Sequence, residues 1–157
     1  MKHFVCLILV NLCLMGCTSN PPVQPPPPPP TVINLQIDPA ANLNADSKGN
    51  GAPVMLRVYE LREQSNFKSA DFFALFNNEK ATLGADLVRK QEILLQPGES
   101  KTLSLAPDDA VQTIGMFAAF RALDTAQWRA VADVKAHQIQ TIHLKLDNNQ
   151  LLLDAGN

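Results

Sequence analysis

From Thr31 onward the chain alternates hydrophobic and polar residues in short segments, the pattern of β-strands that are buried on one face. In the first segment Ile33, Leu35 and Ile37 share one face, and the polar residues between them share the other. A second segment, 54–58, repeats this alternation. The same pattern predicts six further strands, at 92–96, 100–105, 113–121, 128–134, 138–146 and 150–154.

One segment departs from the alternation and predicts a helix. Ser69 is a residue type that caps helices, and Phe72, Leu75 and Phe76 follow it at the spacing of one helical face. The helix is expected to end near 77–78, where two asparagines follow each other.

Turn signals divide the remaining segments. A second short helical turn is expected within 81–89, although Gly84 weakens it. A turn is expected at Pro97-Gly98, and the last two strands should form a tight hairpin across residues 148–149. Many short strands separated by turns are typical of a sandwich or barrel. The sequence therefore predicts a mostly antiparallel β-sandwich with a short helical insertion after the second strand.

The first sixteen residues have the pattern of an export signal. A charged start is followed by an apolar run at 4–14, which is shorter than the roughly 20 residues that a membrane-spanning helix needs. The run leads into the sequence LMGC at 14–17, which is typical of a lipoprotein cleavage site. We therefore predict a cleaved signal peptide at 1–16 and lipid attachment to Cys17. The other two cysteines leave with the signal, so the mature chain has no partner for an internal disulfide.

A proline-rich spacer follows the signal. Residues 21–30 read PPVQPPPPPP and hold eight of the twelve prolines. Such a run forms a polyproline II rod of about 3.1 Å per residue, which would hold the folded part roughly 30 Å from the bilayer. A proline-rich ligand for an aromatic groove is the alternative interpretation. Thr18, in place of the aspartate that typically retains lipoproteins in the inner membrane, favours the outer membrane.

Three regions are expected along the chain. These are the signal peptide at 1–16, the lipidated N-terminus and spacer at 17–31, and one β-sandwich domain at 32–157.

Charge and candidate chemistry narrow the function classes. The formal net charge is -2 and no basic cluster stands out, which argues against nucleic acid or anionic lipid head groups as partners. His137 falls in a loop, His143 on the polar face of a strand, and Asp108-Asp109 in a solvated turn. These residues do not have the spacing of a metal site or of a nucleophile with its base. The sequence also contains no glycine-rich phosphate loop. We therefore predict that the protein is not an enzyme and carries no cofactor beyond its lipid.

The few aromatic residues fall in or beside predicted elements, so we expect them in the core. Trp128 has a second interpretation, as an interface anchor beside Arg129. The residues concerned are Phe67, Phe72, Phe73, Phe76, Phe117, Phe120 and Trp128.

The connection at 39–53, between the first two strands, is longer than a simple strand connection requires. It contains several asparagines and two glycines. Loops of this length tend to be functional or mobile, and length alone leaves both possibilities open.

Short motifs in a fixed order cover nearly all of residues 32–134. They are RVYEL at 57–61, Phe67, ADFFALF at 70–76, LGADL at 83–87, Glu92, LQPGE at 95–99, AAFR at 118–121 and DTAQWR at 124–129. In this order, and behind a lipoprotein signal, they resemble the type VI secretion lipoprotein family, also called TssJ, SciN or VasD.

The resemblance implies an outer-membrane lipoprotein with a transthyretin-like β-sandwich and an added helical segment. It implies a scaffold that binds the periplasmic C-terminal region of the inner-membrane protein TssM. In the family the loop between the first two strands is a contact region. The candidate partner-binding residues are therefore Asn42, Leu43, Asn44, Ala45, Asp46, Lys48 and Asn50.

Two other functions remain open at this stage. One is another envelope-assembly or pilotin-like binding lipoprotein that uses the same sandwich. The other is a hydrolase or protease inhibitor, which would require a deep pocket around His143 or His137.

Overall fold

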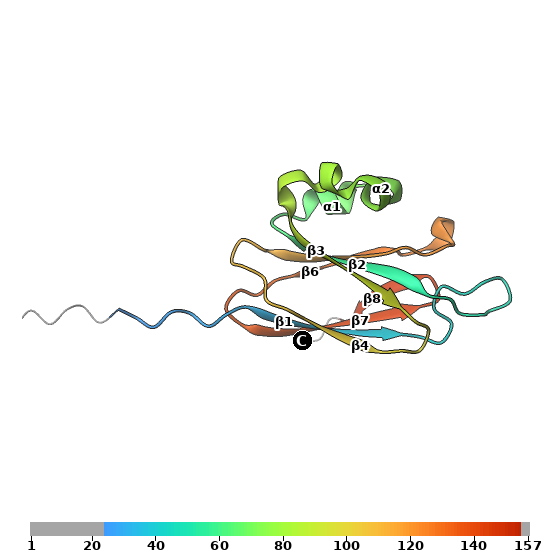
Figure 1. The fold of residues 1–157 in the computed structure, drawn as a ribbon, viewed down its shortest axis with the longest axis horizontal. Coiled ribbons are helices and arrows are strands. Elements are labelled where there is room, and N and C mark those ends of the chain that lie inside the picture. The colour runs from blue at the N-terminus through green and yellow to red at the C-terminus, as the bar shows by residue number, and fades with distance from the viewer. Residues whose placement is uncertain (1–23, 155–157) are drawn as a thin grey trace, which may run out of the picture.

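The computed structural model describes residues 24–154 and consists of two β-sheets packed face to face, with helices over the outer face of one sheet (Figure 1). Two helices, α1 (Ser65–Ser69) and α2 (Phe72–Leu83), and the 3₁₀ turn η1 (Gly84–Asp86) lie between the second and third strands. A second 3₁₀ turn, η2 (Leu123–Thr125), precedes the sixth strand. This confirms the predicted sandwich and its helical insertion. The strands are β1 (Val32–Pro39), β2 (Val54–Leu61), β3 (Leu87–Leu95), β4 (Lys101–Leu105), β5 (Thr113–Ala118), β6 (Arg129–Asp133), β7 (Ile139–Asp147) and β8 (Gln150–Asp154).

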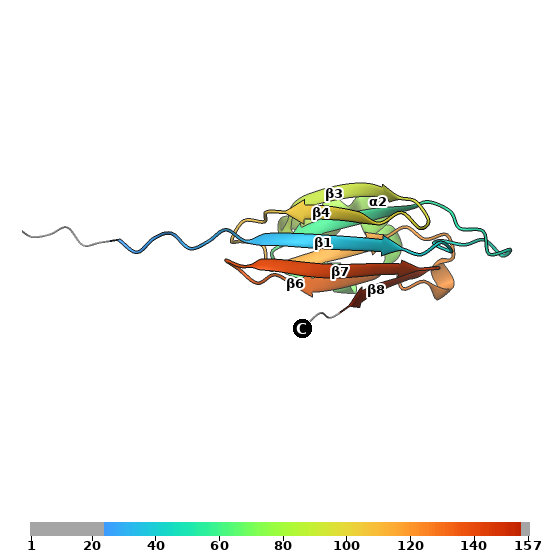
Figure 2. The ribbon, with the colours of Figure 1, turned by 90° about the horizontal axis from the view of Figure 1, so that it is seen from below.

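The two sheets have the strand orders β4-β1-β7-β8 and β3-β2-β5-β6. Figure 2 shows the first sheet from outside, with β1 between β4 and β7. Among the described strands every pairing is antiparallel except that of β1 with β7, which run in the same direction. Parallel neighbours need a long connection, and here the chain builds the whole second sheet between them. Alternation predicts which face of a strand is buried, but it does not predict strand direction.

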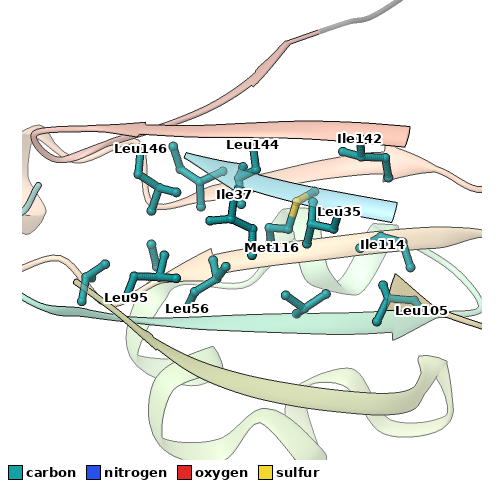
Figure 3. Packing of buried hydrophobic residues seen from close by; sticks show 14 of the residues in the cluster. Leu35, Ile37, Leu56, Leu95, Leu105, Ile114, Met116, Ile142, Leu144 and Leu146 are labelled. Atoms are coloured by element: carbon teal, nitrogen blue, oxygen red, sulfur yellow. The ribbon is translucent and has the colours of Figure 1, made fainter. Parts of the chain in front are cut away.

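The main core lies between the inner faces of the two sheets (Figure 3). In β1 the side chains of Ile33, Leu35 and Ile37 are fully buried, while Gln36 and Asp38 are exposed, as the alternation predicts. Burial of each such aliphatic side chain contributes about 1.5–3 kcal/mol. A slip of β1 by one residue would turn all three toward solvent, so the core fixes its register.

Strand β5 is buried on both faces because the helices cover the outer face of its sheet. Met116 faces the main core, whereas Phe117 packs under the helices. Gly115, in the same strand, leaves room for α1 to approach, because a Cβ at this position would lie 3.1 Å from the Phe67 ring. The strand ends at Ala118, earlier than the expected 121.

Helix α2 begins later than the sequence suggested. Asp71, and not Ser69, is its N-cap: the Asp71 carboxylate accepts a hydrogen bond of 2.9 Å from the backbone N–H of Ala74. Ser69 instead closes the short helix α1. Serine and aspartate are both good caps, so the sequence alone could not choose between positions two residues apart.

Helix α2 also ends later than expected. The asparagine pair at 77–78 produces a kink, with Asn78 at φ -142° and ψ 37°, and the helix then continues to Leu83. The helical turn expected within 81–89 is present only as the 3₁₀ turn η1. Those residues finish α2, form η1 and begin β3 at Leu87.

A second hydrophobic cluster joins the helices to the outer face of β2 and β5. Its fully buried aromatic members are Tyr59, Phe67 and Phe117. Trp128 packs against it, with its ring centroid 5.4 Å from that of Phe72 and 5.5 Å from that of Phe117. These contacts favour core packing over the interface interpretation of Trp128.

Two aromatic side chains of α2 were expected in the core, but the structure leaves both exposed. Phe73 is 60% exposed and Phe76 is 38% exposed. Phe73 follows Phe72 directly, so it points about 100° around the helix from the buried face. Phe76 keeps a stacked contact with Phe72, at 5.6 Å between ring centroids, and the Arg57 guanidinium lies 5.1 Å from its ring centroid, so it is only partly exposed.

The buried carboxylate of Glu79 fixes the second half of α2 to the sheet. Its Oε2 accepts hydrogen bonds from the Tyr59 hydroxyl at 3.0 Å and from Arg57 Nη1 at 3.2 Å, and its Oε1 pairs with Lys90 Nζ. Arg57 and Lys90 also pair with Glu92, at 2.9 and 3.0 Å. Burial raises the pKa of the Tyr59 hydroxyl, which therefore stays protonated as a donor.

Arg57 has a further role at the kink. Its Nη1 donates to the backbone carbonyls of Leu75 and Phe76, at 3.1 and 2.9 Å, just before the non-helical Asn78. The guanidinium thus satisfies carbonyls where the regular helical hydrogen-bond ladder is interrupted.

Glu60 is a second buried carboxylate, at the end of β2, and it is only 2% exposed. Neither of its oxygens has a hydrogen-bond donor among residues 24–154, and the nearest cation, Arg89 Nη1, lies 3.4 Å from Oε1. Burial raises the pKa of Glu60; Arg89 opposes this rise and Asp108 adds to it.

The spacer and the β1–β2 loop lie at opposite ends of the sandwich (Figure 1). Residues 24–30 are exposed and lead into the start of β1. There the backbone N–H of His137 donates to Thr31 Oγ1 at 2.9 Å, and His137 Nδ1 lies 3.1 Å from the carbonyl oxygen of Pro29. Because β1 crosses its whole sheet, the loop that follows emerges at the far end.

The predicted signal peptide at 1–16 and Cys17 lie outside the described residues. Within the part of the chain that the structure describes, no helix is long and apolar enough to cross a membrane.

Replacing Glu79 with alanine is expected to lower the free energy of unfolding by about 3 kcal/mol, because it leaves Arg57 and Tyr59 without their buried acceptor. Urea unfolding followed by circular dichroism would measure this. The matched control is Glu99→Ala, which removes an exposed pair with Lys101 and should cost less than about 1 kcal/mol. Equal effects of the two substitutions would contradict the role of Glu79.

Replacing Glu60 with glutamine is expected to change the pH dependence of stability. The pKa of Glu60 is higher in the folded than in the unfolded state. Ionisation of this residue therefore lowers the free energy of unfolding as the pH rises above the ordinary pKa of a glutamate. The stability of Glu60→Gln relative to the natural chain should therefore increase between about pH 4 and pH 8. Urea unfolding across that range would test this, and a pH-independent difference would contradict it.

Candidate partner-binding surface

The loop between β1 and β2 is tied to the end of the sandwich at its base, while its tip projects outward (Figure 1). The side chain of Leu43 is fully buried in the main core, and Asn44 is only 7% exposed. The structure therefore places Leu43 and Asn44 inside the fold and not on the expected contact surface. Of the candidates, Asn42, Lys48 and Asn50 are exposed. The other two, Ala45 and Asp46, are partly exposed.

Asn44 connects three loops. Its side-chain Oδ1 accepts from the backbone N–H of Arg121 at 2.9 Å, and its Nδ2 donates to the carbonyl of Pro53 at 3.0 Å. Its backbone N–H donates to the carbonyl of Asn148 at 2.6 Å. Asn44 has a φ of 50°, a left-handed conformation that asparagine tolerates better than most residues.

The loop tip is organised by Asp46. One carboxylate oxygen accepts from the backbone N–H groups of Lys48 and Asn50, at 2.8 and 3.0 Å, and the other accepts from Asn50 Nδ2 at 3.1 Å. The side-chain hydrogen bond from Asn50, helped by the two backbone bonds, lowers the pKa of Asp46. Asp46 is thus engaged within its own turn.

Side-chain hydrogen bonds also join the other loops at this end. Asn42 Nδ2 donates to the Asp147 carboxylate at 3.0 Å, which ties the β1–β2 loop to the end of β7. Asn149, in the β7–β8 turn, donates to the Thr125 hydroxyl at 2.7 Å, which ties that turn to η2. The three loops therefore form one connected surface.

A hollow of about 690 Å³ lies between these loops. Lys48 and Asn50 are not among the residues that line it. Most of the residues that line it have polar side chains, with a single basic one, Arg121, and a single acidic one, Asp46. The polar side chains that line it are Asn42, Asp46, Ser47, Arg121, Thr125, Asn148 and Asn149.

Sequence reasoning missed the contributions of Arg121, Thr125 and Asn148 to this surface. The turn at 148–149 was predicted as a hairpin, but its position beside the β1–β2 loop depends on the parallel pairing of β1 with β7. The strand order that brings Arg121 to the same end is likewise a tertiary feature. No local signal in the sequence could have identified these neighbours.

The candidate catalytic residues are not brought together. His143 borders a hollow of about 330 Å³ on the outer face of β1, β7 and β8, with Asp38 and Lys145 among its neighbours. Within the described residues no hydrogen bond or ion pair connects His143 to a carboxylate, and no group of three His, Cys, Asp or Glu side chains could hold a metal. His137 lies at the spacer, at the opposite end from the loop surface.

Comparisons with known proteins extend these observations. The profile of the family described as "Type VI secretion lipoprotein, VasD, EvfM, TssJ" matches residues 31–149. Among curated protein sequences none matches the chain.

Three solved structures share the fold. The T6SS lipoprotein TssJ1 from Pseudomonas aeruginosa is 38% identical, with a TM-score of 0.79 over 82% of this chain and 98% of that one. Serratia marcescens Lip, described as a membrane bound component of the type VI secretion system, is 26% identical, with a TM-score of 0.74 over 80% and 98%. A chain of the structure described as the T6SS protein TssM C-terminal domain from EAEC is 25% identical, with a TM-score of 0.68 over 80% and 99%.

The family match runs from the residue before β1 to the β7–β8 turn, so it includes the helical insertion and all the loops of the candidate surface. A structural lipoprotein, and not an enzyme, is the class of protein that this match indicates. Profile, identity and fold agree: the chain belongs to the type VI secretion lipoprotein family.

Proposed function

We propose that the protein is the outer-membrane lipoprotein of a type VI secretion system, and that it anchors the trans-envelope complex by binding the periplasmic C-terminal region of TssM. The observation that carries the proposal is that the two functional parts lie at opposite ends of the sandwich. The spacer joins one end, and the connected loop surface lies at the other. Membrane attachment and partner binding therefore use different ends of the molecule.

Attachment is proposed to occur through lipid on Cys17. Each buried CH₂ of an acyl chain contributes about 0.8 kcal/mol, so two or three chains make a stable anchor, whereas one chain binds only marginally. Thr18, which follows the lipidated cysteine, supports the outer membrane as the destination.

The spacer is proposed to set the distance between the lipid and the sandwich. Ten residues at about 3.1 Å each reach roughly 30 Å in the polyproline II conformation. A sandwich held at that distance, with its loops at the far end, faces into the periplasm, where the soluble part of an inner-membrane protein can reach it.

The loop surface is proposed as the contact with TssM. A related chain occurs in the structure described as the TssM C-terminal domain, which supports this choice of partner. The loop hydrogen bonds of Asn44 and Asp46 exist in the free protein, so binding would not have to order this surface first. Such preorganisation reduces the entropic cost of association.

Replacing Cys17 with serine is expected to release the protein from the outer membrane while leaving its affinity for TssM unchanged. Membrane fractionation and pull-down of TssM from solubilised envelopes would measure the two effects. Recovery of the serine variant with the outer membrane would contradict the anchoring role. Loss of TssM binding by a folded serine variant would contradict the separation of the two ends.

Changing the exposed loop tip by Ser47→Arg together with Lys48→Glu is expected to weaken TssM binding about tenfold or more, because size and charge change at the contact surface. Stability should be unaffected, since neither side chain makes a hydrogen bond to the described residues. The control changes two exposed residues at the spacer end, Asp109→Arg with Lys135→Glu, and should leave binding intact.

The experiment uses the mature lipidated protein in detergent and the purified periplasmic region of TssM. Unchanged affinity of the loop-tip variant would remove the tip from the contact. Absence of binding by the natural chain would overturn the proposed function and favour another envelope-assembly or pilotin-like role.

A further inference from the structure

Arg121 occupies a fixed position on the wall of the hollow. It follows Phe120, whose side chain is only 3% exposed in the main core, so the chain is anchored immediately before it. Its own backbone N–H is held by Asn44 Oδ1 at 2.9 Å. The start of the Arg121 side chain is therefore set by the fold, whereas the side chain itself is exposed.

The guanidinium of Arg121 has no partner within the described residues, unlike those of most other arginines in this part of the chain. Arg57 and Arg89 form ion pairs with carboxylates. Arg129 donates to the carbonyls of Phe67 and Ala70. Arg62 resembles Arg121 in lacking a side-chain partner, but it follows β2 at the spacer end.

Asp46 is the only acidic side chain lining the hollow. The charge of Arg121 makes a small contribution to the lowered pKa of Asp46, but the two side chains are not in contact. The two oxygens of Asp46 already accept three hydrogen bonds from residues 48 and 50, and no ion pair within 4.0 Å joins it to Arg121. The other polar side chains that line the hollow are amides and hydroxyls, which leave the cation unpaired.

Building on the proposed function, we infer that Arg121 is the specificity-determining residue of the loop surface: its guanidinium pairs with a carboxylate side chain of the partner polypeptide that enters the hollow. Asn44 is its positioning residue, because it holds the Arg121 backbone and shapes the adjoining loop.

The chemistry of the hollow supports a carboxylate. A guanidinium presents donors in a planar fork that fits a carboxylate with two parallel hydrogen bonds, and charge-assisted bonds of this kind are about twice as strong as neutral ones. The amides and hydroxyls around it can bind the polar groups of a polypeptide. A membrane phosphate is a poor alternative, because the hollow lies at the end opposite to the spacer.

The test measures the affinity and association rate of the mature lipidated protein for the periplasmic region of TssM, at low and high salt. Arg121→Ala should weaken binding by about 10-fold to 100-fold, and Arg121→Glu by more. Arg121→Lys should recover only part of the loss, because an ammonium lacks the fork. Arg62→Ala, the matched control at the spacer end, should change affinity less than about twofold.

A double-mutant cycle identifies the pairing itself. Each aspartate and glutamate of the TssM region is changed to alanine and combined with Arg121→Ala. One of them should show strong coupling: its change to alanine should weaken binding to the natural chain but have much less effect on binding to Arg121→Ala. A purely structural role of Arg121 would give no such single partner.

Asn44→Gly tests the positioning role, since glycine keeps the left-handed backbone and removes both side-chain hydrogen bonds. It should weaken binding in the natural chain but have little further effect when Arg121 is already alanine. Additive losses would show that Asn44 acts independently of Arg121.

The outcomes separate the inference from the proposed function. If Arg121→Ala binds like the natural chain while the loop-tip variant is impaired, the inference is wrong and the proposed function stands. If no carboxylate couples to Arg121, the assigned chemistry is wrong. If the natural chain itself fails to bind TssM, both the proposed function and the inference are overturned.

Discussion

Strand β1 is held between β4 and β7, and its course through the sheet decides where the other functional parts lie. It pairs with β7 along its whole length and with β4 over most of it, and three of its side chains are fully buried. A shift by one residue would bring these side chains to the surface, so the strand cannot slide without loss of the core. It receives the spacer at one end and delivers the long loop at the other. A force applied between lipid and partner would therefore pass along a strand that is hydrogen-bonded on both sides.

The helices cover the outer face of the second sheet, and this contact combines hydrophobic packing with a buried polar network. The outer face of β2 and β5 carries the buried side chains of Tyr59 and Phe117, and α1 and α2 cover it with Phe67 and Leu75. Because α2 is kinked, hydrophobic packing alone does not satisfy its backbone there. Arg57 of β2 donates to the helix carbonyls at the kink, and Glu79 of α2 accepts hydrogen bonds from Arg57 and Tyr59 of the sheet. Such a network is stabilising only when it is complete, since a single missing partner leaves a buried charge uncompensated.

Period-two alternation was enough to predict the fold class and most of the strands, because burial of one face is a local property of the sequence. It worked for β1, where hydrophobic and polar residues alternate strictly. It could not set the limits of α2, since Ser69 and Asp71 are both good caps and the asparagines at 77–78 could either end a helix or kink it. It also could not assemble the candidate surface. From the sequence, Leu43 cannot be distinguished from an exposed loop residue until the core that receives it is known. Arg121 becomes a neighbour of Asn44 only through the order of the strands.

The asparagines explain how a surface made of loops can be stiff. Asn44 and Asn148 both adopt positive φ, at 50° and 53°, which glycine would also allow. Glycine, however, would supply the turn without any side-chain hydrogen bond, and it would increase the freedom of the unfolded chain. Asn44 uses its side chain to bind two other backbone segments, and Asn149 does the same for η2. Asn44 thus both permits its tight turn and connects it to the neighbouring loops, whereas in the β7–β8 turn Asn148 adopts the positive φ and the next residue, Asn149, makes the connection. These bonds set the shape of the hollow before a partner arrives.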